Sequence, residues 1–284
     1  MQWLVTGAGG MLGRDVCAVL ERGGESVTRG EHATLDITDA DAVQAAVAGH
    51  DVVVNTAAWT DVDGAEAHEA AATHVNGEGP RQLAVACRDL GARLVQVSTD
   101  YVFDGTATRP YPEDAPTDPA SAYGRSKAAG EHAVRKELPG GHLLVRTAWL
   151  YGAGGSCFPK TIVRLARERG RVDVVDDQLG QPTWSHDVAA LVLRLVRAGA
   201  PAGSYHATST GQASWFAFAR EVVASAGLDP ETVHPTTSDR FPSPAPRPAS
   251  SVLGHEALNR LGIAPIGDWR ERWAEASPAV LAAG

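Results

Sequence analysis

A glycine run near the start of the chain limits the fold more than any other segment does. Gly7, Gly10 and Gly13 follow one another at intervals of three residues. They lie between a short apolar segment at residues 3–5 and residues 12–20, whose apolar positions have helical spacing. This order predicts a strand, a tight turn and a helix. A glycine turn that binds nothing is the alternative.

Each glycine has its own physical role in such a turn. Gly7 permits the sharp turn, Gly10 lets the backbone approach a pyrophosphate, and Gly13 lets the helix pack closely. The helix N-terminus then presents backbone N–H groups to the phosphates. We therefore expect a dinucleotide to bind here.

Short apolar segments alternate with helical stretches through the first half of the chain. We expect strands at residues 3–5, 26–28, 51–55, 94–97 and 143–146. We expect helices between them at residues 11–21, 40–48, 75–89 and 126–136. The alternation predicts an α/β fold with a doubly wound, Rossmann-type parallel sheet.

After residue 150 the pattern is less regular, with a helix at 161–169 and a Pro-rich stretch at 241–248. This part of the chain is typical of a smaller C-terminal α/β region that binds a substrate. The expected domains are residues 1–150 for dinucleotide binding, which also take in about 181–207, and residues 151–180 with 208–284 for substrate binding.

Composition and charge exclude several classes of protein. Of the 284 residues, 44% are hydrophobic and 21% are charged, as is usual for a soluble globular protein. A net charge of -9 and the absence of a long basic run argue against binding of nucleic acid. Arg146 and Arg194 interrupt the longest apolar stretches, which are too short to cross a membrane.

The cysteines, the histidines and the start of the chain indicate a cytoplasmic protein without a metal site. Cys17, Cys87 and Cys157 are odd in number and far apart, which argues against a disulfide framework. The ten histidines form no ligand-like cluster with cysteines or carboxylates, so we expect no protein-bound catalytic metal. Residues 1–6 lack the basic and apolar regions of a signal peptide, so we expect no export.

Tyr123 and Lys127 are a pair of candidate catalytic residues, four positions apart. In a helix they lie on one face, where the ammonium can stabilise a phenolate and lower the tyrosine's pKa from about 10. Such a phenol can transfer protons near neutral pH. The alternative is an ordinary amphipathic helix surface. The glycine run favours nicotinamide chemistry over that alternative.

Arg29 follows the second expected strand, where sites that prefer NAD usually carry an acid for the ribose hydroxyls. An arginine suits a ribose phosphate, so this position favours NADPH, with NADH or a solvated arginine as alternatives. Asp36 and Ile37 lie in the loop beyond and are expected at the adenine edge. Ala57 and Ala58 end the third strand, where small residues let the backbone lie against the cofactor.

Several sequence blocks follow one another in a characteristic order. They are AAWTDVDGAE at 57–66, VSTDYVFDG at 97–105, YGRSK at 123–127 and RTAWLYG at 146–152, followed by 180–183 with Asp187, 203–206 and 247–253. Over nearly its whole length the chain resembles the dTDP-4-dehydrorhamnose reductase family, in the extended branch of the short-chain dehydrogenase/reductase superfamily. One departure is Cys157, where the family often has an asparagine, so the exact sugar is left open.

The resemblance implies reduction of the C4 keto group of a dTDP-4-keto-6-deoxy sugar by NADPH or NADH. Thr99, Tyr123 and Lys127 would be the catalytic residues, with Tyr123 protonating the sugar oxygen. The implied cofactor-binding residues are Gly7, Gly10, Met11, Leu12, Gly13, Arg29, Asp36, Ile37, Ala57, Ala58, Trp59, Tyr123 and Lys127. The implied substrate-binding residues are Thr99, Asp100, Tyr101, Trp149 and Arg247, the last of these at the pyrophosphate.

Two further functions stay open at this point. Family members also reduce other dTDP-deoxysugars of secondary metabolism, of the dihydrostreptose type. A related non-catalytic protein serves as an NADP-binding regulatory subunit, although intact Thr99, Tyr123 and Lys127 argue against that role. Tyr101 stands where sugar dehydratases of this fold carry a glutamate, which favours reduction over dehydration. We expect a monomer or a homodimer.

Overall fold

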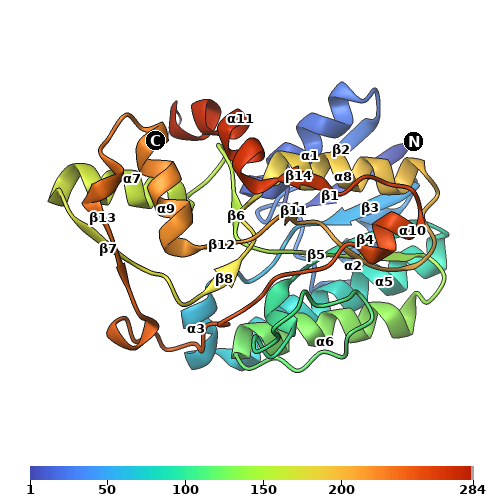
Figure 1. Ribbon diagram of the computed structural model, residues 1–284. Coiled ribbons are helices and arrows are strands. Elements are labelled where there is room, and N and C mark those ends of the chain that lie inside the picture. Colours follow the sequence, from blue (N-terminus) through green and yellow to red (C-terminus); the bar gives the residue numbers. More distant parts are fainter. Residues whose placement is uncertain (283–284) are drawn as a thin grey trace.

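A parallel sheet of six strands lies at the centre of the protein, with helices on both faces (Figure 1). The computed structural model describes residues 1–282. The strands are β1 Gln2–Thr6, β2 Ser26–Gly30, β3 Val52–Asn55, β4 Arg93–Thr99, β5 His142–Thr147 and β10 Gly203–His206. Their order is β10-β5-β4-β3-β1-β2, and every neighbouring pair is parallel. The doubly wound fold and the five predicted strands are confirmed, and the strand ends differ by one or two residues.

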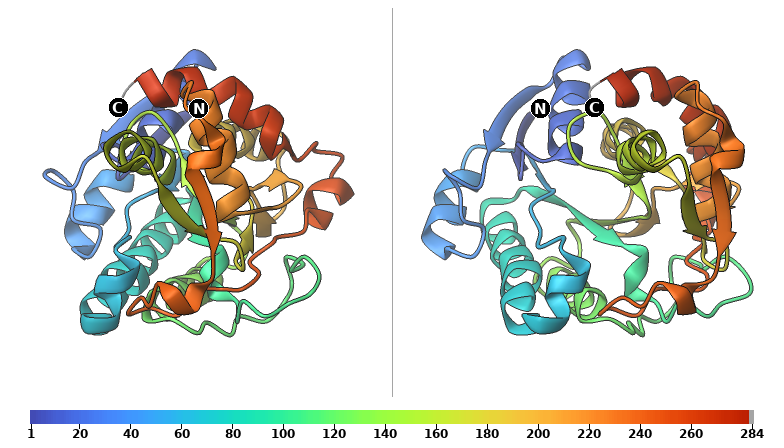
Figure 2. Two further views of the ribbon diagram at one scale, coloured as in Figure 1. Left: turned by 60° about the vertical axis from the view of Figure 1, so that its left-hand side comes forward. Right: turned by 90° about the vertical axis from the view of Figure 1, so that its left-hand side faces the viewer.

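Helices cover both faces of the sheet because successive strand residues point to opposite sides. One face carries α1 Met11–Arg22 and α8 Ser185–Arg197, and the other carries α2 Ala40–Val47, α5 Gly79–Leu90 and α6 Ala122–Glu137. Trp3 and Val5 belong to the core beneath α1 and α8, whereas Leu4 between them belongs to the core beneath α2 and α5. The views in Figure 2 show α1 on one side of the sheet and α5 and α6 on the other. The strands are thus buried on both sides, as all-parallel sheets usually are.

The second region has a hydrophobic core of its own, on the left of Figure 1. Its elements are β6 Leu150–Tyr151, α7 Phe158–Arg169, β7 Val172–Val175, α9 Trp215–Ser225, β13 Val233–Thr236 and α11 Trp269–Ala282. The ring of Phe218 lies 5.8 Å from that of Trp269 and 5.5 Å from that of Trp273, measured between centroids. The predicted helix at 161–169 is confirmed as part of α7, but the sequence analysis did not name α9 or α11.

The chain crosses between the two regions more than once. After α7 and β7 it returns to the sheet, where α8 packs against α1 and β10 pairs with β5. Shorter elements complete the described chain: α3 Val62–Ala67, α4 Glu69–Thr73, the π-helical η1 His74–Glu78, η2 Asp100–Val102, β8 Leu179–Gly180, β9 Thr183–Trp184, β11 Ser209–Thr210, β12 Ala213–Ser214, η3 Pro230–Thr232, η4 Ser238–Arg240, α10 Glu256–Arg260 and β14 Ile266–Asp268. The helix predicted at 75–89 therefore divides into η1 and α5, and the one predicted at 126–136 begins earlier, at Ala122.

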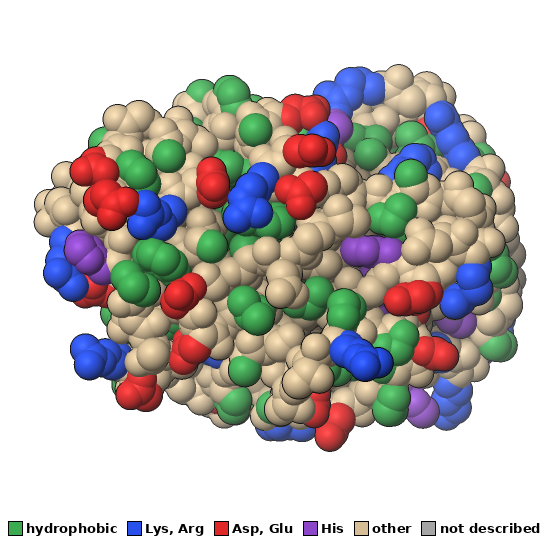
Figure 3. Space-filling view, viewed as in Figure 1, with side chains coloured by type: hydrophobic (Ala, Val, Ile, Leu, Met, Phe, Trp, Pro, Cys, Tyr) green, Lys and Arg blue, Asp and Glu red, His purple; other side chains and the backbone are tan. Residues whose placement is uncertain are grey.

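The surface carries both signs of charge. On the face shown in Figure 3, acidic and basic side chains are interspersed, and neither sign covers a large continuous area. Among the described helices, none is both long enough and apolar enough to cross a lipid bilayer.

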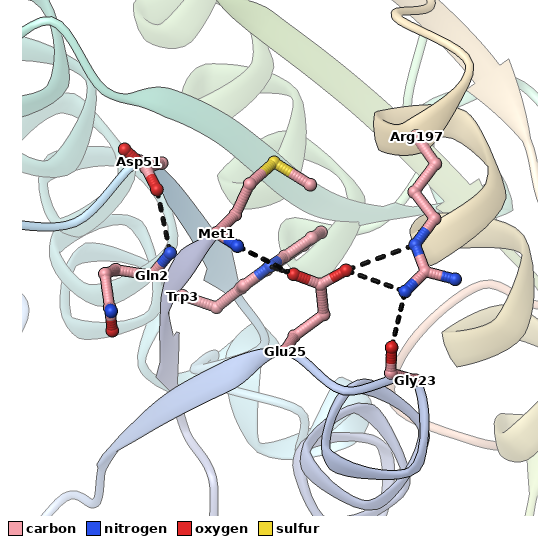
Figure 4. Close-up of polar contacts among 7 residues, drawn as sticks. All are labelled: Met1, Gln2, Trp3, Gly23, Glu25, Asp51 and Arg197. Carbon is pink, nitrogen blue, oxygen red and sulfur yellow. Dashed lines mark hydrogen bonds and ion pairs between the residues drawn. The ribbon is translucent and has the colours of Figure 1, made fainter.

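Glu25 connects β1, the start of β2 and α8 (Figure 4). Its carboxylate accepts hydrogen bonds from Trp3 Nε1 at 3.0 Å, from the Met1 ammonium at 3.0 Å and from Arg197 Nη2 at 2.8 Å. Burial alone would raise the pKa of this carboxyl, but the hydrogen bonds from Arg197, Met1 and Trp3 outweigh burial and lower the pKa from 4.5 to about 2. Glu25 therefore stabilises the fold in its ionised form.

A buried ion pair connects α6 to β5. Arg146 Nε and Nη2 donate to the two carboxylate oxygens of Glu131 at 2.9 and 2.8 Å, and both side chains are at most 1% exposed. Arg146 Nη1 also donates to the Glu113 carbonyl oxygen at 3.1 Å. Burial by itself raises the pKa of Glu131, but the Arg146 guanidinium reverses that effect, so the net pKa is lowered. The pair fixes the position of α6 against the sheet.

Glu25→Gln should lower the free energy of unfolding by about 1–2 kcal/mol at pH 7, because it removes charge-assisted hydrogen bonds. Since the folded state lowers this pKa, the stabilisation is fully present above pH 4.5 and is lost as the pH falls towards 2. Urea denaturation at pH 7 and at pH 3 should show a smaller difference between wild type and variant at the lower pH. Glu168→Gln, which breaks the exposed pair with Arg164, is the control and should have little effect. An equal loss in both variants would contradict the role of Glu25.

Arg146→Met should destabilise the protein by about 3–5 kcal/mol, because it removes the bidentate partner of the buried Glu131 carboxylate and leaves it only the contact with the half-exposed Arg135. Adding Glu131→Met should recover much of that loss, since it removes the poorly compensated charge. The measurement is a double-mutant cycle in urea. Arg125→Met, which breaks the exposed pair with Glu69, should cost less than about 1 kcal/mol. Additive losses at 131 and 146 would show that the two charges do not interact.

Candidate active site

The glycine turn lies at the carboxyl end of β1, where the strand order reverses between β1 and β3. Gly7 has a φ of +68°, and a Cβ on it would lie 2.6 Å from the Ala57 nitrogen. A Cβ on Gly13 would lie 2.2 Å from the Gly7 carbonyl oxygen. Neither position can hold a larger residue, because in both cases the obstacle is backbone. The topological switch point is where open α/β sheets bind ligands.

The N-terminus of α1 is suited to a diphosphate. Gly10 is its N-cap residue, and no side chain caps the helix. Gly9 and Gly10 are exposed, so the first N–H groups of a 12-residue helix are accessible beside a glycine turn. Met11 is half-buried, while Leu12 is buried in the sheet core and holds the helix in place. These features fit the pyrophosphate of a dinucleotide cofactor.

The segment after β3 lies directly beside the turn. Ala57 N donates to Asn55 Oδ1 at 3.1 Å, and Asn55 in turn accepts from Thr6 Oγ1 at 2.6 Å. Ala57, Ala58 and Trp59 are all half-buried. Asn76 fixes the position of Trp59, because its amide accepts from Trp59 N at 2.8 Å and donates to Trp59 O at 3.0 Å. Thus the structure brings the predicted residues of the first and third strands together.

At the end of β2, the side chain nearest the glycine turn is not the expected Arg29. Arg29 is half-exposed and forms an ion pair with Glu21 at 2.7 Å, so its guanidinium already has a partner. Glu31, which follows the strand, lies closer to the glycine turn, since its Cδ is 3.8 Å from the position of a Cβ on Gly9. Among the described residues, no side chain or backbone donor is paired with the Glu31 carboxylate. The sequence analysis did not select Glu31 because it expected the strand to end at residue 28.

Asp36 and Ile37 lie in the segment between β2 and α2. The Asp36 carboxylate accepts from Thr38 N at 2.9 Å and from Thr38 Oγ1 at 2.8 Å and forms a local turn. Ile37 is 5% exposed and packs against Gly79, where an added Cβ would be 2.5 Å from its Cδ1. The Ile37 side chain thus lies in the core beneath α2 and α5, and the adenine contact predicted for Asp36 and Ile37 stays a prediction.

Thr99, Tyr123 and Lys127 lie together at the carboxyl end of β4. Thr99 is the last residue of the strand, and the other two lie on one face of α6. The N-terminus of α6 is firmly held, because Ser121 Oγ accepts from Gly124 N at 3.1 Å and Glu66 Oε1 accepts from Ala122 N at 2.8 Å. These caps begin the helix early enough to include Tyr123.

The environment of the three groups sets their protonation. Burial raises the pKa of Tyr123, and the nearby Asp100 charge raises it further, while a hydrogen bond with Thr99 acts in the opposite direction. Burial lowers the pKa of Lys127 from 10.5 to about 8. Lys127 Nζ donates to the Val97 carbonyl oxygen at 2.8 Å, which holds the side chain along β4. Tyr123 is thus protonated in the resting protein and can act as an acid.

Tyr101 and Arg247 meet beside this group. The Tyr101 ring contacts the edge of Tyr123 at 5.7 Å between centroids, and Arg247 Nη1 donates to Tyr101 Oη at 3.4 Å. Arg247 also forms an ion pair with Asp63 at 2.7 Å. A cavity of about 180 Å³ lies here, lined by Tyr101, Phe103, Ser121, Pro246, Arg247 and Pro248. A larger hollow of about 650 Å³ near Arg135, Ser204 and Arg260 contains no predicted site residue.

Trp149 has a backbone conformation that is rare for a bulky residue. Its φ is +46°, and its ring stacks on Trp215 at 3.6 Å and 7°. A Cβ on Gly180 would lie 2.3 Å from the indole, so only glycine is compatible there. Strained backbone of this kind is often found at binding sites. Trp215 was not predicted, because a tryptophan in α9 carries no sequence signal for a site.

A protein-family model and two relatives of known name are similar to this chain over almost its whole length. A family model described as "RmlD substrate binding domain" matches residues 1–281. The dTDP-4-dehydrorhamnose reductase of Streptomyces griseus is 52% identical over 98% of this chain and 94% of its own. The dTDP-4-keto-6-deoxy-D-glucose reductase of Streptomyces niveus is 50% identical over 98% of this chain and 96% of its own.

A solved structure has the same fold over almost its full length. The dTDP-4-dehydrorhamnose reductase of Bacillus anthracis, crystallised in complex with NADP, superposes with a TM-score of 0.93 at 35% identity. The match covers 97% of this chain and 98% of the other. With family model, sequence and fold in agreement across the chain, the protein belongs to the dTDP-4-dehydrorhamnose reductase family.

Proposed function

We propose that this protein uses NADPH, with NADH as a second cofactor, to reduce the C4 keto group of a dTDP-4-keto-6-deoxyhexose. The proposed substrate is dTDP-4-dehydro-L-rhamnose and the product dTDP-L-rhamnose. The observation that carries the proposal is the placement of Thr99, Tyr123 and Lys127 at the carboxyl end of β4, at the same edge of the sheet as the glycine turn and the uncapped N-terminus of α1. The names of the relatives supply the sugar, and the NADP complex of the Bacillus anthracis protein supports the cofactor.

The chain's own residues would hold both ligands. Gly7, Gly10 and the N-terminus of α1 would bind the cofactor's pyrophosphate, and the segment around Ala57 would lie along its other side. Lys127 would bind the nicotinamide ribose. Arg247 would neutralise the substrate's diphosphate, for which its pair with Asp63 has to rearrange. Trp149 and Tyr101 would border the sugar.

Reduction of the ketone requires one hydride and one proton. The reduced nicotinamide supplies the hydride to C4 when it is bound. Tyr123 donates its phenolic proton to the sugar oxygen as negative charge develops there. Thr99 donates a hydrogen bond to the same oxygen, and the Lys127 ammonium stabilises the resulting phenolate.

A second candidate substrate is dTDP-4-keto-6-deoxy-D-glucose. The relative from Streptomyces niveus, named as its reductase, is almost as similar to this chain as the dehydrorhamnose reductase from Streptomyces griseus. The two sugars differ in ring configuration, so the groups bordering the sugar would decide between them. Comparison of kcat/KM for both sugars under the same conditions separates the two functions.

Tyr123→Phe should reduce kcat for ketosugar-dependent NADPH oxidation by about 10²–10⁴-fold, because it removes the proton donor and leaves the ring in place. Absorbance of the reduced nicotinamide follows the reaction, with enzymatically prepared dTDP-4-dehydro-L-rhamnose as substrate. Tyr205→Phe on β10, whose hydroxyl donates to the Pro201 carbonyl oxygen at 2.8 Å, is the control and should retain activity.

Three other outcomes of that assay would contradict the proposed function or the proposed role of Tyr123. Isomerisation of the sugar without net cofactor oxidation would indicate an epimerase. Tight NADPH binding without turnover of either ketosugar would support a regulatory subunit. Full activity of Tyr123→Phe would exclude the proposed proton donor.

Glu31→Gln should lower KM for NADPH about tenfold and leave kcat unchanged, because the carboxylate beside Gly9 repels a ribose phosphate and favours ribose hydroxyls. Arg29→Gln should act in the opposite direction and raise KM for NADPH. Steady-state kinetics with both cofactors measures the two variants. An unchanged ratio of KM for NADPH to KM for NADH in both would show that neither side chain contacts this part of the cofactor.

A further inference from the structure

Asp100 is a buried carboxyl group in the middle of the candidate active site. It begins η2, directly after β4, and is only 3% exposed. Its Oδ2 atom has no hydrogen-bond partner among the described residues. Buried carboxylates are normally fully hydrogen-bonded or paired with a cation, so a free oxygen here requires an explanation.

Thr99 connects Asp100 to Tyr123. Thr99 Oγ1 donates to Asp100 Oδ1 at 2.9 Å and accepts from Tyr101 N at 3.2 Å. The Tyr123 phenol lies close enough to the same hydroxyl for Thr99 to lower the pKa of the tyrosine. A hydroxyl has one proton and two lone pairs and can rotate, so it can accept from one neighbour while it donates to another. The three side chains therefore form a continuous path for a proton.

The ionisable surroundings of Asp100 favour its neutral form. Burial raises its pKa from 3.8 to about 6, whereas the nearby Ser251 hydroxyl, which is not within hydrogen-bonding geometry of the carboxyl, and the hydrogen-bonded Thr99 hydroxyl lower it. The titratable groups that face it are the phenols of Tyr101 and Tyr123, whose pKa values are both raised by the Asp100 charge. No cationic side chain among residues 1–282 is ion-paired with Asp100. A carboxyl group in such surroundings can hold a proton near neutral pH.

We propose that Asp100, in its protonated form, returns a proton to Tyr123 through the Thr99 hydroxyl after each reduction. This inference rests on the proposed reductase function. Its basis is the placement of three groups in series: the half-buried Tyr123 phenol, the buried Thr99 hydroxyl and the buried Asp100 carboxyl, whose Oδ1 is 2.9 Å from Thr99 Oγ1 and whose Oδ2 has no hydrogen-bond partner among the described residues.

The proton transfers balance in the following order. The Tyr123 O–H bond breaks as the sugar oxygen takes its proton, and Tyr123 becomes a phenolate. The Thr99 Oγ–H proton then moves to the phenolate, and the Asp100 carboxylic proton moves to Thr99 Oγ. Asp100 is left as a carboxylate and takes up a proton from solvent when the product leaves. No oxidant or reductant takes part in these steps.

The relay and a role in sugar binding lead to different pre-steady-state behaviour. In Asp100→Asn, Tyr123 is still protonated at the start, so the first turnover should be as fast as in the wild type. Later turnovers should be at least about tenfold slower, because Asn cannot supply a proton. Rapid mixing with NADPH and dTDP-4-dehydro-L-rhamnose resolves the burst from the steady state. Asp89→Asn on the exposed surface of α5 is the control and should show no such difference.

The pH dependence supplies an independent test that does not require the Asp100 variant. Because the neutral acid is the active form, kcat of the wild type should fall as the pH rises through about 6. Ser251→Ala removes a hydroxyl that stabilises the carboxylate, so the fall should move to higher pH. Asp100→Asn should lack this fall altogether.

The possible outcomes separate the relay from a role in sugar binding and from failure of the proposed function. A burst followed by slow turnover in Asp100→Asn, with the shift in Ser251→Ala, supports the relay. Equal loss of the burst and the steady state would show that Asp100 orients the sugar, and would overturn the relay. Equal rates in variant and wild type, or an unmoved profile in Ser251→Ala, would also overturn it. Absence of ketosugar reduction in the wild type would instead refute the proposed function.

Discussion

The buried ion pair between Arg146 and Glu131 is the interaction on which the geometry of the site depends. It joins the carboxyl-terminal part of β5 to the middle of α6, one helical turn beyond Lys127. Two opposite charges placed this deep are stable only when their geometry is nearly ideal. The bidentate contact therefore permits little sliding of α6 along the sheet. Tyr123 and Lys127 keep their position relative to Thr99 because the helix that carries them cannot shift.

The same pair also shapes the electrostatics around the catalytic residues. Glu131 is the one charged group that favours the Lys127 ammonium, which burial otherwise destabilises. Burial outweighs this attraction and lowers the pKa of Lys127 from 10.5 to about 8. Burial also raises the pKa of Asp100, and among the described residues no ion-paired cation offsets it. The site thus combines a weakly basic lysine with a weakly acidic aspartate, and both can change protonation close to neutral pH.

The sequence predicted the first half of the fold because its signals are local. Strand and helix periodicities and the glycine run are all contained within a few residues, and these elements were confirmed. Helices α9 and α11 were not named, although their buried positions, such as Phe218 with Val222 and Trp269 with Trp273, do recur at helical spacing. The early start of α6 depends partly on a distant partner, since Glu66 caps the helix across 56 positions beside the local Ser121 cap. Capping of that kind leaves no local signature.

Ion pairs limited the prediction of the site in a similar way. The sequence shows that Arg29 and Arg247 are present near the right elements, but not that Glu21 and Asp63 already hold their guanidinium groups. Each arginine would have to exchange a carboxylate for a phosphate on ligand binding. Both pairs are partly exposed, so each exchange breaks an interaction of at most about 1 kcal/mol. A phosphate that accepts a bidentate contact offers more than that. The structure is therefore compatible with both arginines as ligand-binding groups. The exchange at Arg247 would release Asp63 Oδ2, while Asp63 Oδ1 could still accept from Ala245 N and hold the segment at residues 241–248.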